Sequence, residues 1–242
     1  MRTALSILLL FAMQVGSLFA DDFSAAGEAY VAGDFLKARE LFQKQSEAAP
    51  GAAVFYNVGN ACFRLGEMGP AALAYERALV LRPVYGEAAA NLRLVREKAA
   101  SRVEEKSWAQ YFLTTVPLRD ALWIGVALTW TGIVLLGWLM WRRADALPLL
   151  GTVFVIIAGL GYTAAIVWIA GIQQQIAIVT VEKAEAHIDP SERSSIADTL
   201  PAGSRVYCEG QQGAWIYCKL PNGAHGWVRT GEVERLHPAP KS

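Results

Sequence analysis

The stretch that decides the fold of the first hundred residues is YNVGNACFRLGEMGPAALAYERALVLRP, residues 56–83. It combines small residues, one aromatic residue and a final proline at helical spacings: Gly59, Ala71, Tyr75, Ala78 and Pro83. Gly66-Glu67 separates two helical patterns, and Gly69-Pro70 falls in the first turn of the second, where a proline N–H is not needed. The pattern predicts two antiparallel helices that approach closely at small residues and pack around Tyr75.

The same pattern occurs earlier in the chain. Four residues precede their counterparts in the quoted stretch by 33 positions: Gly33, Ala38, Phe42 and Pro50. A partial third copy starts at Tyr85 and has the residues expected of a terminal cap. Two-helix units that recur at this period stack into solenoids. Residues 21–99 are therefore expected to form an all-α repeat domain.

This pattern resembles the tetratricopeptide repeat, whose small, aromatic and proline positions are occupied here by Gly59, Ala71, Tyr75, Ala78 and Pro83. The resemblance implies a concave surface that binds an extended peptide or a helix. By register, four residues of the second copy line that surface: Tyr56, Asn60, Phe63 and Arg64. The alternative is that Phe63 packs inside and Arg64 is simply solvated.

The middle of the chain has the composition of a membrane segment. Hydrophobic residues make up 54% of the chain and charged residues 18%, against about 25% charged in soluble domains. Residues 121–141 and 146–172 contain no charge, and each is long enough to cross about 30 Å of hydrocarbon. They predict a two-helix transmembrane hairpin with a loop at 142–145.

The charged stretch from Glu97 to Lys106 is expected to be helical, and residues 100–120 form either a juxtamembrane segment or the last solenoid helix.

Residues 1–20 have the pattern of a signal peptide, with Arg2 before an apolar run and Ala20 before the expected cleavage point. An uncleaved anchor is the alternative. In either case residues 21–120 are exported, and Arg142-Arg143 face the cytoplasm as the positive-inside rule requires. The expected location is a bacterial inner membrane, with both flanking domains in the periplasm.

Residues 176–238 change to a period of two. Four short strands are predicted, over residues 176–181, 204–209, 214–219 and 225–229. The blocks Gly213-Ala214-Trp215 and Gly226-Trp227-Val228 resemble signatures of the bacterial SH3-like (SH3b) domain, which implies an all-β barrel. Trp215, Tyr217 and Trp227 are candidates for an aromatic groove suited to a peptide or a cell-wall glycopeptide. The alternative is that they belong to the barrel core with incidental exposure, and Trp227 is expected in the core.

Two cysteines flank the predicted turn between the second and third of these strands. Alternation places Cys208 and Cys218 on the same face of the two strands. The sequence leaves two interpretations open: a disulfide, which an oxidising compartment would preserve, or two small buried hydrophobic residues. Cys62 lies at a core position of a repeat helix and is expected only to pack there.

Nothing in the sequence points to catalysis. It has no HExxH, GxSxG or phosphate-loop motif, and the spacing of its histidines and cysteines gives no zinc site. We therefore expect no enzyme activity, no metal and no cofactor. Lys plus Arg and Asp plus Glu are both 22, so bulk positive charge does not favour a nucleic-acid partner.

The order of these parts is informative: signal, repeats, two spans and SH3-like domain. This multidomain architecture resembles the BatE-type proteins of the aerotolerance (Bat) operons. The resemblance implies an inner-membrane scaffold or adaptor whose partners are von Willebrand A-domain membrane proteins and a MoxR-type ATPase in an envelope stress-tolerance complex. The alternative is a peptidoglycan-binding module that recruits a cell-wall enzyme.

Overall fold

The computed structural model describes residues 23–103, 118–142 and 146–236. The predicted signal peptide lies outside the described residues, as do parts of the predicted juxtamembrane segment and loop. The chain divides into two compact units. One unit combines the residues up to Glu104 with those from Ala177 onward, and the other comprises Glu105–Ile176.

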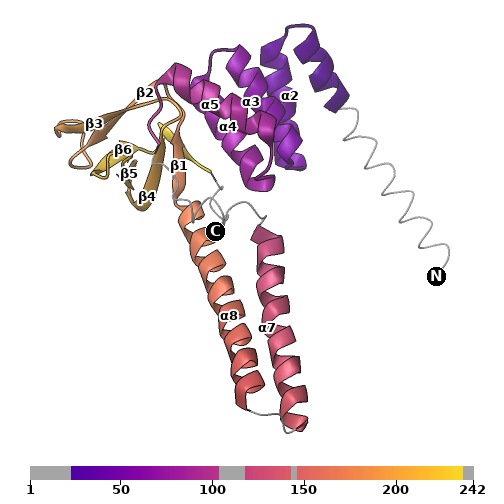
Figure 1. Cartoon of the computed structure of the whole chain (residues 1–242). Coiled ribbons are helices and arrows are strands. Elements are labelled where there is room, and N and C mark those ends of the chain that lie inside the picture. The colour runs from indigo at the N-terminus through magenta and orange to yellow at the C-terminus, as the bar shows by residue number, and fades with distance from the viewer. Residues whose placement is uncertain (1–22, 104–117, 143–145, 237–242) are drawn as a thin grey trace, which may run out of the picture. The chain divides into compact units, whose positions relative to one another are not determined.

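The first unit begins with a helical part. After a helix over residues 23–31, it contains α2 (Phe35–Ala48), α3 (Ala52–Arg64), α4 (Met68–Leu81) and α5 (Gly86–Ala99), which are labelled in Figure 1. From α2 to α5, each helix packs against the next. The closest approach is at Gly59, where an added Cβ would lie 2.6 Å from the ring of Tyr75. A glycine is therefore required at this crossing, as the small-residue pattern predicts.

The sequence repeat recurs in the backbone of the helical part. Gly33 and Gly66, which lie between the helices of the two copies, both have φ of +83°, a conformation that glycine adopts without strain. The next N–H groups, of Asp34 and Glu67, donate to carbonyls five residues earlier, each at 2.9 Å. The two copies therefore turn the chain in the same way.

The helix predicted from Glu97 to Lys106 ends at Ala99, so the prediction is wrong for residues 100–103, and residues 104–106 lie outside the described residues. Ala100 has φ of +51°, and the N–H of Ser101 donates back to the carbonyl of Arg96 at 2.9 Å. The reason lies in the following residues, which bond to the β part of the unit instead. The N–H of Arg102 donates to the hydroxyl of Ser204 at 2.9 Å, and the N–H of Arg205 donates to the carbonyl of Arg102 at 3.0 Å.

The described residues after α8 form one antiparallel sheet of seven strands: β1 (Ile176–Val179), β2 (Lys183–His187), β3 (Ile196–Pro201), β4 (Arg205–Gln212), β5 (Trp215–Lys219), β6 (His225–Arg229) and β7 (Val233–Arg235). The order across the sheet is β3-β2-β6-β5-β4-β1-β7. Its core consists of small and branched side chains, including Val179, Ala186, Leu200, Val206, Ile216 and Val228.

The sheet differs from the predicted strands in three ways. The strand predicted over residues 204–209 continues, as β4, to Gln212. The first strand ends at Val179. The N–H of Thr180 still donates to the carbonyl of Glu232 at 2.9 Å, but the N–H of Glu232 donates to the carbonyl of Arg229 at 3.0 Å and does not complete the pair. Strands β2, β3 and β7 were not predicted. In β2 the inward residues are Ala184 and Ala186, whose small side chains give only a weak alternation of hydrophobicity in the sequence.

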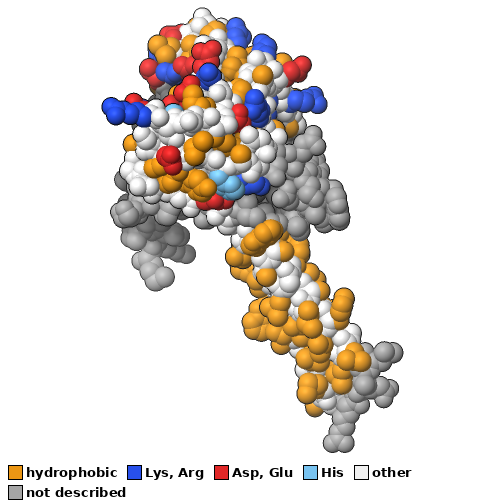
Figure 2. Space-filling view, turned by 90° about the vertical axis from the view of Figure 1, so that its left-hand side faces the viewer, with side chains coloured by type: hydrophobic (Ala, Val, Ile, Leu, Met, Phe, Trp, Pro, Cys, Tyr) orange, Lys and Arg blue, Asp and Glu red, His pale blue; other side chains and the backbone are white. Residues whose placement is uncertain are grey.

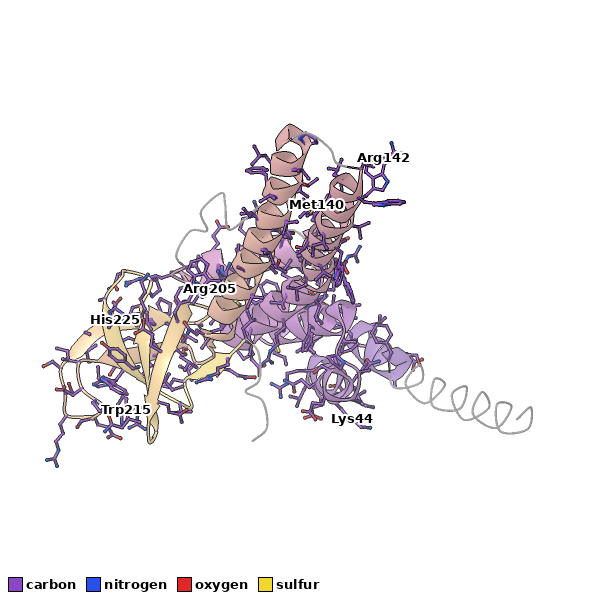
Figure 3. The ribbon with its side chains drawn as sticks, turned by 90° about the horizontal axis from the view of Figure 1, so that it is seen from below. Lys44, Met140, Arg142, Arg205, Trp215 and His225 are labelled. Carbon is purple, nitrogen blue, oxygen red and sulfur yellow. The ribbon has the colours of Figure 1, made fainter. Side chains whose placement is uncertain are left out.

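A buried ion cluster joins the helical and β parts of the first unit. The carboxylate of Glu76 on α4 accepts hydrogen bonds from the guanidinium groups of Arg96 on α5 and Arg205 on β4. Glu76 and Arg205 are only 5% and 6% exposed. Burial lowers the pKa of Arg96. In Arg205 burial also acts to lower the pKa, but Glu76 and Tyr207 together outweigh it and the pKa is raised. Figure 3 labels Arg205 on the sheet.

Backbone contacts extend this junction on both sides. Arg77 donates to the carbonyl of Arg235 at 3.0 Å and to the carboxylate of Glu234 at 2.7 Å. A Cβ added to Gly69 would lie 2.4 Å from the carbonyl oxygen of Thr180. Because the main chains come this close, the helical and β parts pack directly against each other and are not two separate domains joined by a linker.

The second unit contains α7 (Leu118–Trp141) and α8 (Ala146–Gln174), which pack against each other as a hairpin. Both helices are long and apolar enough to cross a membrane, and apolar side chains cover their surface in Figure 2. The helices approach closely at Gly159, where an added Cβ would lie 2.6 Å from the hydroxyl of Thr129. That hydroxyl donates to the carbonyl of Gly125 at 2.9 Å, so it is satisfied within its own helix.

Replacing Glu76 by Gln tests the junction. Glu76→Gln keeps the shape of the side chain but leaves two buried guanidinium groups without their counter-charge. We expect the free energy of unfolding to fall by about 3–5 kcal/mol, as for other buried ion pairs that lose one partner. The measurement is urea denaturation of the full-length protein in detergent, followed by far-ultraviolet circular dichroism.

The matched control is Glu192→Gln. Glu192 pairs with Arg229 at an exposed site, so the same chemical change there should alter stability by no more than about 1 kcal/mol. Equal stability of the two variants would show that the Glu76 cluster makes no special contribution.

Candidate functional site

The strongest candidate surface is the outer face of β5 and β6. In β5 the side chains of Ile216 and Cys218 are buried, whereas Trp215 and Tyr217 alternate with them and are half-buried. Trp227 lies on β6 directly opposite Tyr217. The prediction that Trp227 belongs to the core is therefore wrong.

The reason is the register of β6. Gly226 and Val228 occupy the inward positions of this strand, and a Cβ on Gly226 would lie 3.1 Å from the Cβ of Ala186. No room for an indole exists on that side. Trp227 therefore faces outward and joins the other aromatic residues of the sheet.

These rings make two groups of contacts, which we together call the aromatic face: His187 with Trp215, and Tyr217 with His225 and Trp227. The ring centroids of Tyr217 and Trp227 are 5.0 Å apart, and the ring of His225 stacks on Tyr217 at 5.5 Å. The ring of Trp215 meets His187 edge-on at 5.2 Å. Figure 3 labels Trp215 and His225 on their strands.

Charged groups border the aromatic face. The guanidinium of Arg229 lies 5.6 Å from the ring centroid of Trp215 and also pairs with Glu192. Nε2 of His225 lies 3.4 Å from a carboxylate oxygen of Glu209. Half-buried rings that can stack, next to groups that can hydrogen-bond, suit the recognition of a peptide or a sugar.

The four residues of α3 that were predicted to bind a partner lie in surroundings unlike those of the aromatic face. The side-chain oxygen of Asn60 accepts hydrogen bonds from the hydroxyl of Tyr75 at 2.8 Å and from the amide of Asn91 at 3.1 Å. Tyr75 is fully buried, and burial raises the pKa of its phenol. Asn60 therefore helps to satisfy a core hydroxyl, whatever else it binds.

The other three residues of that group lie along α3. Tyr56 is half-buried, and its ring centroid lies 5.1 Å from that of Tyr85. Phe63 is half-buried, and Arg64 is exposed with its guanidinium 4.3 Å from the ring centroid of Phe35. The structure thus adds Tyr85 and Asn91 to the predicted set. Their place in the third repeat copy was the available signal for both.

The three cysteines are free thiols. Cys208 and Cys218 are opposite each other on β4 and β5, with their Sγ atoms 3.6 Å apart. Cys62 is fully buried in the helical part, and burial raises its pKa to about 12. Cys62 is therefore protonated at neutral pH and packs as a hydrophobic residue.

Within the described ranges, no group of three or more His, Cys, Asp or Glu side chains is placed to hold a metal ion. The sequence matches no protein-family model and no curated protein. The candidate site is therefore defined by its geometry alone.

A double-mutant cycle tests whether Asn60 serves the core. Asn60→Ala leaves the buried hydroxyl of Tyr75 without its acceptor, and we expect a loss of about 1–3 kcal/mol in the free energy of unfolding. Tyr75→Phe removes the hydroxyl itself, so Asn60→Ala should cost much less in that background. A coupling energy of at least about 0.5 kcal/mol, measured by urea denaturation of the four proteins, is expected. Additive losses would contradict the assignment.

Proposed function

We propose that this protein is a membrane-anchored scaffold that binds partner proteins through the aromatic face of its sheet and the surface of its repeat helices. The observation that carries the proposal is the aromatic face itself. Three large rings, of Trp215, Tyr217 and Trp227, stand half-buried on the outside of a sheet whose core is already filled. Aromatic residues of this kind are enriched among the residues that dominate binding at protein interfaces.

We assign the helical part to the tetratricopeptide class. The assignment is supported by the two equivalent glycine turns at Gly33 and Gly66 and by the Gly59–Tyr75 crossing. We assign the sheet to the SH3-like class, supported by its seven short antiparallel strands and by the Trp215 and Trp227 blocks. Both assignments follow from the resemblance of the residues at these positions.

We further propose that α7 and α8 span a bacterial inner membrane and that the larger unit lies in the periplasm. The residues up to Glu104 and those from Ala177 onward belong to the same compact unit, which supports a hairpin with both flanks on one side. The residues Arg142-Arg143 support a cytoplasmic loop, and the pattern of residues 1–20 supports export.

The chain order supports a BatE-type role in a Bat-like complex. In this proposal the partners are A-domain membrane proteins and a MoxR-type ATPase, and the protein acts by binding, without catalysis, cofactor or nucleic acid. The packed junction around Glu76 supports such a role, because it holds two binding surfaces at a fixed distance on one body.

The test is a crosslinked pull-down of the full-length protein from detergent-solubilised membranes, analysed by mass spectrometry. The native protein should recover A-domain proteins and the ATPase. The double variant Trp215→Ala/Tyr217→Ala should lower that recovery by at least about tenfold, since truncating each central aromatic residue of an interface costs about 2 kcal/mol or more.

The matched control is Lys183→Ala/Glu185→Ala, which removes an exposed ion pair on β2. It should leave recovery unchanged. Equal recovery with all three proteins would reject the aromatic face as the binding surface. Absence of A-domain proteins and the ATPase from the native sample would reject the Bat-like complex.

The second candidate is a peptidoglycan-binding module that recruits a cell-wall enzyme. The nearly parallel rings of Tyr217 and His225, with an interplanar angle of 17°, favour it, since flat aromatic platforms suit sugar rings. Co-sedimentation of the full-length protein with purified sacculi tests it. The intact protein is needed, because the sheet shares its junction with the helices.

A further inference from the structure

The most specific unexplained feature of the sheet is the pair Cys208 and Cys218. The two residues face each other directly in the antiparallel ladder of β4 and β5. Opposed residues in such a ladder have Cα atoms about 4.5–5.5 Å apart, which falls within the range that a disulfide accepts. The Sγ atoms are already 3.6 Å apart, so closing the bond needs a side-chain adjustment and no change of register.

The two thiols differ in their surroundings. Cys218 is fully buried between Val206, Ile216 and other core residues, whereas Cys208 retains 5% exposure. Cys208 also adjoins an irregularity of the ladder, because the register shifts between Cys208 and Gly210. Cys208 is therefore the thiol that lies nearer to solvent and to a break in the regular ladder.

We infer that Cys208 and Cys218 form a redox couple, which a protein or small-molecule disulfide converts from the dithiol seen here to an intramolecular cross-strand disulfide. The inference goes beyond the proposed scaffold function and does not depend on it. In the oxidised form the disulfide links β5, the strand that carries Trp215 and Tyr217, covalently to β4.

The reaction balances as a thiol–disulfide exchange. The Cys208 thiolate attacks the external disulfide, forms a mixed disulfide and releases one thiol. The Cys218 sulfur then attacks Cys208, closes the internal bond and releases the second thiol. Two electrons pass to the external disulfide, and the two protons of the protein thiols end on the released thiols.

The polarity of the thiol pair supports this order of attack. The Cys218 thiol donates a hydrogen bond to the Cys208 sulfur. This bond lowers the pKa of Cys208 and raises the pKa of Cys218. Cys208 is therefore the more readily ionised partner and the first nucleophile.

The test uses the full-length protein in detergent, equilibrated with mixtures of reduced and oxidised glutathione. After acid quenching, the protein is denatured and treated with maleimide-polyethylene glycol, which adds one visible step on a gel per free thiol. We expect three steps from the reduced protein and one from the oxidised protein, because only Cys62 stays free. The intact mass should fall by two hydrogens and the protein should stay monomeric on a non-reducing gel.

Two variants separate this outcome from others. Cys62→Ser should give two steps when reduced and none when oxidised. Cys208→Ser should give two steps under both conditions, because Cys218 has then lost its partner. Three steps from the native protein in oxidised glutathione, a bound glutathione or a disulfide-linked dimer would each overturn the inference. None of these readouts involves a partner protein, so failure here is distinct from failure of the proposed function.

Discussion

One buried carboxylate determines how the larger unit is built. Glu76 lies on a helix of the repeat part, yet one of its two arginine partners comes from the sheet. A charge removed from water is tolerated only when it is paired, so α4 and β4 must meet wherever this unit is folded. Further contacts between the two parts surround this pair, among them those of Arg77, Gly69 and Arg102.

The junction with the sheet stabilises the short array of repeat helices. Two copies and a partial third present few interfaces between neighbouring repeats, and solenoids of that length are marginal when isolated. Here α5, the last helix of the repeat part, ends at Ala99, and residues after it bond to Ser204 and Arg205. The sheet therefore acts as the cap that a longer array would provide with further repeats.

Local features were predictable from the sequence, and distant pairings were not. Gly66, Tyr75 and Pro83 predict a helix pair through spacings of about two to three turns, and α3 and α4 confirm it. Strand β2 escaped prediction because alanines fill its inward positions. The core position predicted for Trp227 is wrong because Gly226 and Val228 take the inward positions of β6. No spacing rule connects Glu76 to Arg205, since their pairing exists only once the chain has folded.

The larger unit is discontinuous in sequence, with the hairpin of α7 and α8 inserted between its halves. Contacts such as Arg205–Glu76 join residues 129 positions apart, and closing such long loops slows folding. The antiparallel packing of α7 and α8 brings the start of α7 and the end of α8 to the same end of the hairpin. The two halves of the larger unit therefore have a shorter distance to close than the number of inserted residues suggests. During synthesis the repeat helices therefore lack their contacts with the sheet until the hairpin and the strands after it have been made.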